Sequence, residues 1–75
     1  MYAGPFRNQT AALQALFNGK PIKRKTWRGK SRIDPNRLWD GEWAHTNRKG
    51  KICGWWDANR IIRYSDWDNY MEKGD

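Results

Sequence analysis

Tryptophan content constrains this fold more than any other feature of the sequence. The chain has six tryptophans among 75 residues, whereas leucine, isoleucine and valine are few. A buried indole removes roughly 150–250 Å² from water and needs an acceptor for its N–H, so a core this small cannot comfortably hide six. We therefore expect aromatic side chains to supply much of the core and two or three tryptophans to lie at a surface that binds something.

Covalent and metal support for this core is missing from the sequence. Cys53 is the only cysteine, which excludes an intrachain disulfide, and the single His45 leaves no zinc-ligand spacing. We expect Cys53 to be a small buried or half-buried strand residue rather than a reactive thiol, and we expect no metal and no cofactor. Packing or self-association must then stabilise a single domain, residues 1–75, with an arm at residues 1–8 and a frayed tail at residues 72–75.

A helix is predicted near the N-terminus. From Thr10 to Phe17 the apolar residues recur at helical spacing. Either Thr10 or Asn8 can cap the first turn, and Gly19 supplies a left-handed stop. The pattern indicates a short amphipathic helix of about two turns.

The next segment alternates as a strand does. Pro21 ends the helix, and residues 22–27 alternate before a turn at residues 27–30. Ile22 and Trp27 fall on opposite sides of this alternation. Either the strand contains a bulge, or Trp27 lies beyond the end of the pairing.

The remaining elements follow from turn signals. Turns are predicted at residues 34–36, 40–41 and 47–51, strands at residues 37–39, 42–46, 52–56 and 65–71, and a capped helical turn or a loop at residues 57–64. The sum is an α+β domain in which one short N-terminal helix packs on a small twisted antiparallel sheet of about four strands.

Charge is distributed unevenly along the chain. Residues 1–33 carry eight basic side chains and no acid, whereas residues 34–75 carry seven basic and eight acidic ones. A field of this sign concentrates anionic partners, which include nucleic acid, nucleotides, phosphorylated metabolites and acidic proteins. The sequence shows neither a signal peptide nor an apolar run long enough for a transmembrane span, so we expect cytosolic residence and no membrane partner.

Catalysis is not indicated by any motif. The sequence contains no nucleophile with a partner base in a typical setting, no metalloprotease helix and no phosphate-binding glycine loop. We expect no catalytic residues and no enzymatic activity.

The basic run from residue 20 to residue 33 surrounds Trp27. Seven of its fourteen residues are Lys or Arg, among them Lys25, Arg28 and Lys30. An indole can stack on a nucleobase while neighbouring cations take its phosphates, in a polymer or in a mononucleotide. The alternative is a solvated face that improves solubility and discourages pairing between sheet edges.

Two further places allow two interpretations each. Adjacent strand residues face opposite sides of a sheet, so one of Trp55 and Trp56 is exposed or lies in an interface. Asp66 either pairs with a nearby arginine or accepts a hydrogen bond from a ribose hydroxyl or a base amine.

The stretch AALQALFNGKPIKRKTWRGK, residues 11–30, together with Asp66 and Trp67, resembles a family of small phage and prophage proteins. The shared pattern is a short Ala/Leu helix, Gly-Lys, a strand containing Arg, Trp followed by Gly, and a closing Asp-Trp. The family includes the second type of Thoeris anti-defense protein, a sponge for cyclic-nucleotide-type immune signals such as glycocyclic ADP-ribose. The resemblance implies an α+β fold, a homo-oligomer with ligand pockets between protomers in the host cytoplasm, and no catalysis.

The resemblance also implies site residues. By matched position Trp27 stacks on the ligand, Arg24 and Arg28 contact phosphate, and Asp66 makes a polar contact with the ligand. Lys30 joins these ligand-binding candidates because it flanks Trp27 in the basic run.

The middle of the chain departs from the family pattern. Residues 31–56 do not look like the apolar middle strands of that family. The acidic or Asn position that precedes the closing Asp-Trp falls on Ile61 in register, so Asn59 takes this role if the loop differs.

Three functions follow from these observations. The first is sequestration of a small anionic nucleotide-type signal by a phage-type binding protein. The second is inhibition of a host enzyme or defence complex by direct contact through a Trp-rich surface. Binding of nucleic acid through the basic half ranks third, because acids intermingle with bases after Asp34.

Overall fold

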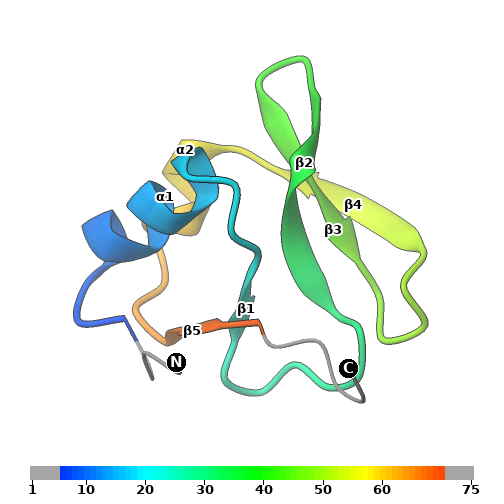
Figure 1. Cartoon of the computed structure of the whole chain (residues 1–75), viewed down its shortest axis with the longest axis horizontal. Helices are drawn as coiled ribbons and strands as arrows, with labels where there is room; N and C mark the ends of the chain where they lie inside the picture. The colour runs from blue at the N-terminus through cyan, green and yellow to red at the C-terminus, as the bar shows by residue number, and fades with distance from the viewer. Residues whose placement is uncertain (1–5, 71–75) are drawn as a thin grey trace.

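The architecture is α+β, as predicted from the sequence. The computed structural model describes residues 6–70, so predictions for residues 1–5 of the arm and for the tail at residues 72–75 lie outside the described residues. Within residues 6–70 the sheet has five strands instead of about four, and a second short helix precedes strand β5. In chain order (Figure 1) the elements are α1 (Gln9–Phe17), β1 (Ile22–Arg24), β2 (Arg32–Trp39), β3 (Glu42–Thr46), β4 (Ile52–Trp56), α2 (Ala58–Ile61) and β5 (Trp67–Asn69).

Helix α1 forms where the apolar spacing predicts it. Of the two candidate caps the structure uses Asn8, whose side chain accepts a hydrogen bond from the N–H of Ala11 at 2.9 Å. Gly19 follows the helix with a φ of 82°, the left-handed conformation expected of the stop. Leu16 is buried in the core, whereas Phe17 at the helix end is 70% exposed.

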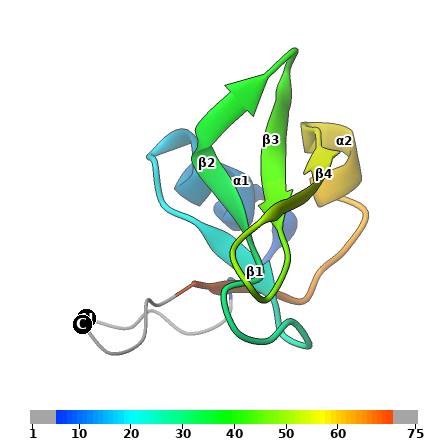
Figure 2. The same ribbon diagram turned by 90° about the vertical axis from the view of Figure 1, so that its right-hand side faces the viewer.

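All five strands are antiparallel and follow the order β4-β3-β2-β1-β5. Strand β1 meets β2 only where Ile22 lies opposite Ile33, and it pairs along its whole length with β5. The two sets of strands therefore diverge, with β1 and β5 crossing below the meander of β2, β3 and β4 (Figure 2). Pairing along β1 stops at Arg24, whose carbonyl accepts the N–H of Trp27 at 3.0 Å. Trp27 thus lies beyond the end of the pairing, one of the two predicted alternatives.

The predicted turn at residues 34–36 is wrong as a strand boundary. These residues lie inside β2, which advances from Asp34 to Leu38 while β3 advances only from Ala44 to Trp43. The Asp34 carboxylate accepts the N–H of Asn36 at 3.0 Å, so the local turn chemistry exists but the strand absorbs it as a bulge. The predicted turn at residues 40–41 is confirmed, with φ values of 53° at Asp40 and 77° at Gly41 that suit a hairpin.

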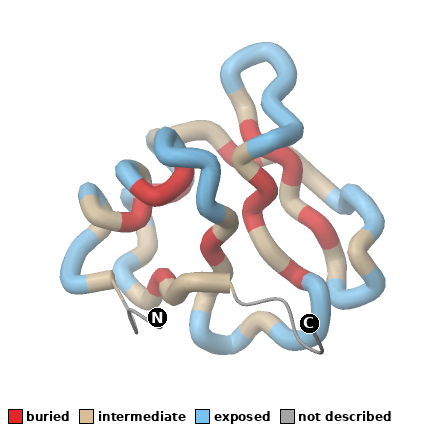
Figure 3. The backbone as a smooth tube through the Cα atoms, viewed as in Figure 1, coloured by how far each residue is buried: buried red, intermediate tan, exposed pale blue. Residues whose placement is uncertain are grey.

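Indoles occupy much of the core, as expected. Trp43, Trp56 and Trp67 are buried, whereas Trp39 at the end of β2 is 68% exposed and Trp55 is half-buried. Trp55 is thus less buried than Trp56, but it is half-buried rather than exposed, and its place in an interface stays a prediction. Figure 3 shows the buried residues on α1 and in the middle of the sheet, with the β2–β3 hairpin tip exposed.

Cys53 is exposed, which corrects the expectation of a buried or half-buried side chain. Strand β4 lies at the edge of the sheet. Its register passes from Gly54 opposite His45 to Ile52 opposite Thr46, so Cys53 is the extra residue of an irregularity. An unpaired residue on an edge strand has little to cover its side chain.

Two loops interlock at one end of the sheet. The N–H of Lys30 donates to the carbonyl of Arg48 at 3.0 Å, and the Thr46 hydroxyl donates to the carbonyl of Lys30 at 2.8 Å. Gly29 has a φ of +62°, and a Cβ atom there would lie 2.7 Å from the carbonyl oxygen of Arg48. Only glycine fits this contact. We call residues 28–30 and 47–51 together the double loop.

The two helices of the described residues are too short to cross a membrane. Among residues 6–70, neither helix has the length and apolar content that a membrane span requires.

Replacing Gly29 tests the interlock. Alanine at a positive φ costs about 1–2 kcal/mol of unfolding free energy, and crowding against Arg48 adds about 1–3 kcal/mol. Gly41→Ala is the matched control, because its φ is +77° but nothing lies within 4 Å of its added Cβ. Urea denaturation should show Gly29→Ala to be clearly less stable than Gly41→Ala, and equal losses would contradict the interlock.

Candidate ligand-binding site

Trp27 joins the basic loop to the aromatic core. Its ring stacks on His45 with centroids 4.3 Å apart and an interplanar angle of 15°. It also meets Trp56 and Trp67 nearly at right angles, each at 5.7 Å between centroids. The side chain is half-buried and packs against the core cluster, so the core holds it while part of it stays exposed to solvent.

His45 belongs to this cluster, although the sequence did not nominate it for the site. Its Nδ1 accepts the indole N–H of Trp56 at 3.3 Å, and its Nε2 lies 3.5 Å from the Ser31 hydroxyl. This geometry fixes the neutral tautomer with hydrogen on Nε2. Burial, followed by the positive charge of Arg60, lowers the pKa of His45 below its ordinary value. Strand alternation could have found it, because His45 shares a face with the buried Trp43.

Arg24 and Asp66 pair with each other. The arginine Nε donates to one carboxylate oxygen at 2.8 Å and Nη2 to the other at 3.1 Å, while the guanidinium lies 4.0 Å from the centre of the Tyr64 ring. The two side chains are 28% and 30% exposed. The hydrogen bonds from Arg24 lower the pKa of Asp66. Of the two interpretations of Asp66, pairing with a nearby arginine is the one present in the structure.

Backbone hydrogen bonds connect this pair to the turn that carries Trp27. The N–H of Lys25 donates to the carbonyl of Asp66 at 3.0 Å, and the turn that begins at Arg24 places the indole. The backbones of Arg24 and Asp66 therefore lie next to the turn that carries Trp27.

Arg28 and Lys30 continue from Trp27 into the double loop, and both are exposed. The β3–β4 turn adds three further exposed cations that the sequence did not nominate: Arg48, Lys49 and Lys51. The turn at residues 47–51 is predicted by local sequence signals. The hydrogen bond that brings this turn next to Lys30 joins residues far apart in sequence, so no local signal predicts it.

Asn59 lies elsewhere. It is an exposed residue of α2, the short helix that Asp57 caps by accepting the N–H of Arg60 at 2.8 Å. Within residues 6–70 it shares no hydrogen bond or ion pair with the other predicted site residues.

Neither a cluster of metal ligands nor a comparison with known proteins indicates a function. Across the part of the chain that the structure describes, no three side chains of His, Cys, Asp or Glu gather as a metal site would need. No family model, curated protein or solved structure matches the chain. Function must therefore be argued from the geometry around Trp27.

The hydrogen bond between Trp56 and His45 predicts a pH dependence of folding. Protonation of Nδ1 would place two N–H groups against each other, so the unfolded chain binds this proton more readily, with a pKa near 6.5. The free energy of unfolding should therefore fall as the pH drops below about 6.5. Urea denaturation between pH 7.5 and pH 5 measures it.

His45→Gln is the control, because glutamine keeps an acceptor but does not titrate. Its stability should change little across this interval. A wild-type protein as stable at pH 5 as at pH 7.5 would show that the imidazole does not accept this hydrogen bond.

Proposed function

We propose that this protein binds a small anionic nucleotide-type ligand at Trp27 and sequesters it without chemical change. The observation that carries the proposal is a half-buried indole, anchored on His45, that is followed at once by the exposed cations Arg28 and Lys30. A flat base can contact the accessible part of the indole while the cations meet phosphate oxygens.

The energetics favour such a site. Stacking of a base on an aromatic side chain contributes about 1–3 kcal/mol, and hydrogen bonds between cations and phosphate are among the stronger ones in proteins. The loop after Trp27 is held by the backbone hydrogen bond from Lys30 to Arg48 and by the close approach at Gly29. A loop that is already ordered loses little conformational entropy on binding.

We assign Arg24 and Asp66 to positioning. Their bidentate contact at 2.8 and 3.1 Å satisfies the carboxylate and much of the guanidinium, and it ties β1 to the segment before β5. A phosphate at Arg24 would have to compete with this partner. Phosphate contacts therefore fall to Arg28 and Lys30, and Asp66 acts on the ligand through the placement of Trp27.

The biological role follows from the resemblance to phage anti-defense proteins. Capture of a cyclic-nucleotide-type immune signal in the host cytoplasm would prevent that signal from reaching its receptor. In a homo-oligomer with the ligand between protomers, a second protomer would contact the ligand opposite the half-buried Trp27.

A thermal-shift screen tests ligand capture. Cyclic dinucleotides, cyclic trinucleotides and cyclic ADP-ribose isomers should include a ligand that stabilises the protein. At a hundredfold excess over its dissociation constant it adds about 2.7 kcal/mol, which raises Tm by roughly 10–20 °C in a domain of this size. Absence of any shift across the whole set, with the oligomer intact, would contradict the proposal.

Paired variants locate the site. Arg28→Gln with Lys30→Gln should weaken binding by about tenfold or more per lost phosphate contact. Arg63→Gln with Lys20→Gln removes the same two charge types at exposed positions elsewhere and should leave affinity unchanged. Equal weakening in both pairs would indicate attraction by net charge alone.

Direct inhibition of a host protein is the second candidate, and one observation favours it. Leu38 is 60% exposed and Trp39 is 68% exposed near the tip of the β2–β3 hairpin. Large exposed aromatic side chains are typical of interface hot spots. Stoichiometric inhibition of a purified host defence enzyme would support this function instead of ligand capture, provided that the Trp39→Ser variant no longer inhibits it.

A further inference from the structure

The double loop gathers cations from both halves of the chain. Residues 25–33 and residues 43–56 contain no Asp or Glu. The ion pairs within residues 6–70 are Arg24 with Asp66 and Arg37 with Asp34, and neither involves the double loop. Its five exposed cations are Arg28, Lys30, Arg48, Lys49 and Lys51.

The backbone that carries these cations is held in place. Asn47 accepts the N–H groups of Lys49 and Lys51 at 2.9 and 3.1 Å, which closes the β3–β4 turn on itself. The turn is joined to the other loop by the hydrogen bond from Lys30 to Arg48 and by the contact at Gly29. Only side chains remain to be ordered when an anion binds.

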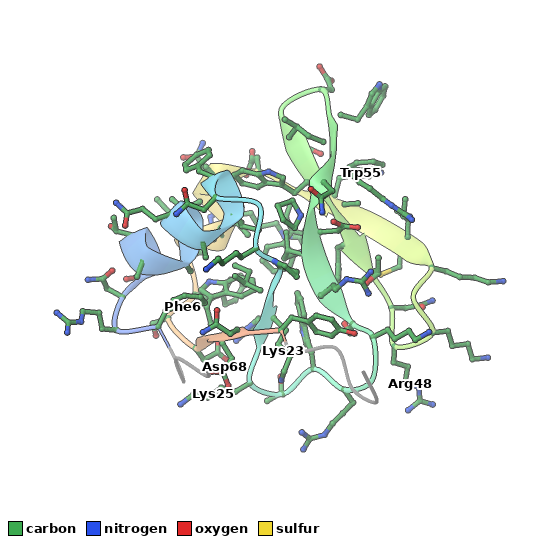
Figure 4. All side chains as sticks on the ribbon, viewed as in Figure 1. Phe6, Lys23, Lys25, Arg48, Trp55 and Asp68 are labelled. Atoms are coloured by element: carbon green, nitrogen blue, oxygen red, sulfur yellow. The ribbon has the colours of Figure 1, made fainter. Side chains whose placement is uncertain are left out.

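Several acids that intermingle with bases in the sequence lie away from the double loop in the described residues. Asp40 and Glu42 lie at the β2–β3 hairpin tip, at the upper edge of Figure 1, whereas the β3–β4 turn and the β1–β2 loop lie toward the lower right. In Figure 4 Arg48 lies at the lower right, apart from Asp68, the acid that the figure labels. Asp66 is neutralised by Arg24. Asp34 likewise pairs with Arg37, so for these four acids the intermingling with bases along the sequence does not extend to the double loop.

We infer that the double loop binds the phosphate backbone of nucleic acid. A nucleotide-type ligand at Trp27 needs the nearest two cations, Arg28 and Lys30, and it leaves three on the turn without a partner. Phosphates repeated along a strand can engage all five. The side-chain oxygen of Asn47 is already used within the turn, where it accepts the N–H groups of Lys49 and Lys51. Contacts of Lys and Arg with phosphates carry no information about base sequence. We therefore expect the binding to be independent of base sequence.

Salt dependence is the first test. Fluorescence anisotropy with labelled 20-nucleotide single strands and duplexes of unrelated sequence should give similar affinities for each sequence. For duplex DNA, log K should fall with log salt with a slope of about −3 to −4.5, since each neutralised phosphate contributes about −0.9. No binding at about 50 mM salt, or a slope near zero, would overturn the inference.

Charge removal is the second test. The triple variant Arg48→Gln, Lys49→Gln, Lys51→Gln should reduce the magnitude of the slope by roughly 2 to 3. The matched triple Arg7→Gln, Lys20→Gln, Arg63→Gln removes three exposed cations elsewhere and should leave the slope nearly unchanged. Equal reductions would assign the binding to overall charge and overturn the role of the double loop.

A third comparison changes geometry without changing charge. Gly29→Ala forces the two loops apart and should weaken DNA binding more than Gly41→Ala, which meets no neighbour. If Gly29→Ala does not fold, the glutamine triple decides alone. Polyglutamate that displaces DNA at equal charge concentration would overturn the assignment in favour of an acidic protein.

The two proposals fail separately. The glutamine triple retains Arg28 and Lys30, so it should keep the thermal shift with a nucleotide-type ligand while its DNA binding weakens and the salt slope falls. A triple that keeps DNA binding overturns only the inference about the double loop. If no nucleotide-type ligand shifts the Tm of the wild-type protein, only the proposal of ligand capture is overturned.

Discussion

Perpendicular packing of three indoles is the interaction on which the rest of this structure depends. Trp27, Trp56 and Trp67 meet one another at interplanar angles of 81°, 87° and 82°, with centroids 5.6 to 5.7 Å apart. The N–H of Trp67 donates to the carbonyl of Ile61 at 2.9 Å, and that of Trp56 to His45. Each of these two buried rings thus brings its own polar partner, and a core short of aliphatic side chains is filled without an unsatisfied donor.

Function depends on how this core reaches the surface. Trp27 packs in the aromatic core and also begins the basic loop. Core packing therefore fixes where this loop starts. The contact of Arg24 with Asp66 fixes the strand before it, and the close approach of Gly29 to Arg48 fixes the residues after it. The exposed cations on this support are the ones that we propose to capture phosphate groups.

Local signals made part of this structure predictable. The cap at Asn8, the stop at Gly19 and the glycine of the hairpin turn each act within a few residues, so the sequence specifies them directly. The bulge after Asp34 was missed because the same Asp-Pro-Asn chemistry serves a turn or an irregular strand, and only pairing with β3 decides which. Likewise, the stacking of His45 and the approach of the β3–β4 turn to Lys30 join segments that no local pattern connects.

Backbone dynamics on the picosecond to nanosecond scale test the central claim, which is that the aromatic core holds both basic loops as one rigid unit. The direct measurement is the ¹⁵N order parameter of each backbone N–H in residues 27–31 and 47–51. Our account predicts values of about 0.85, equal to those of the strands. Values below about 0.6 would contradict it, because loops that mobile could not present their cations in a fixed arrangement.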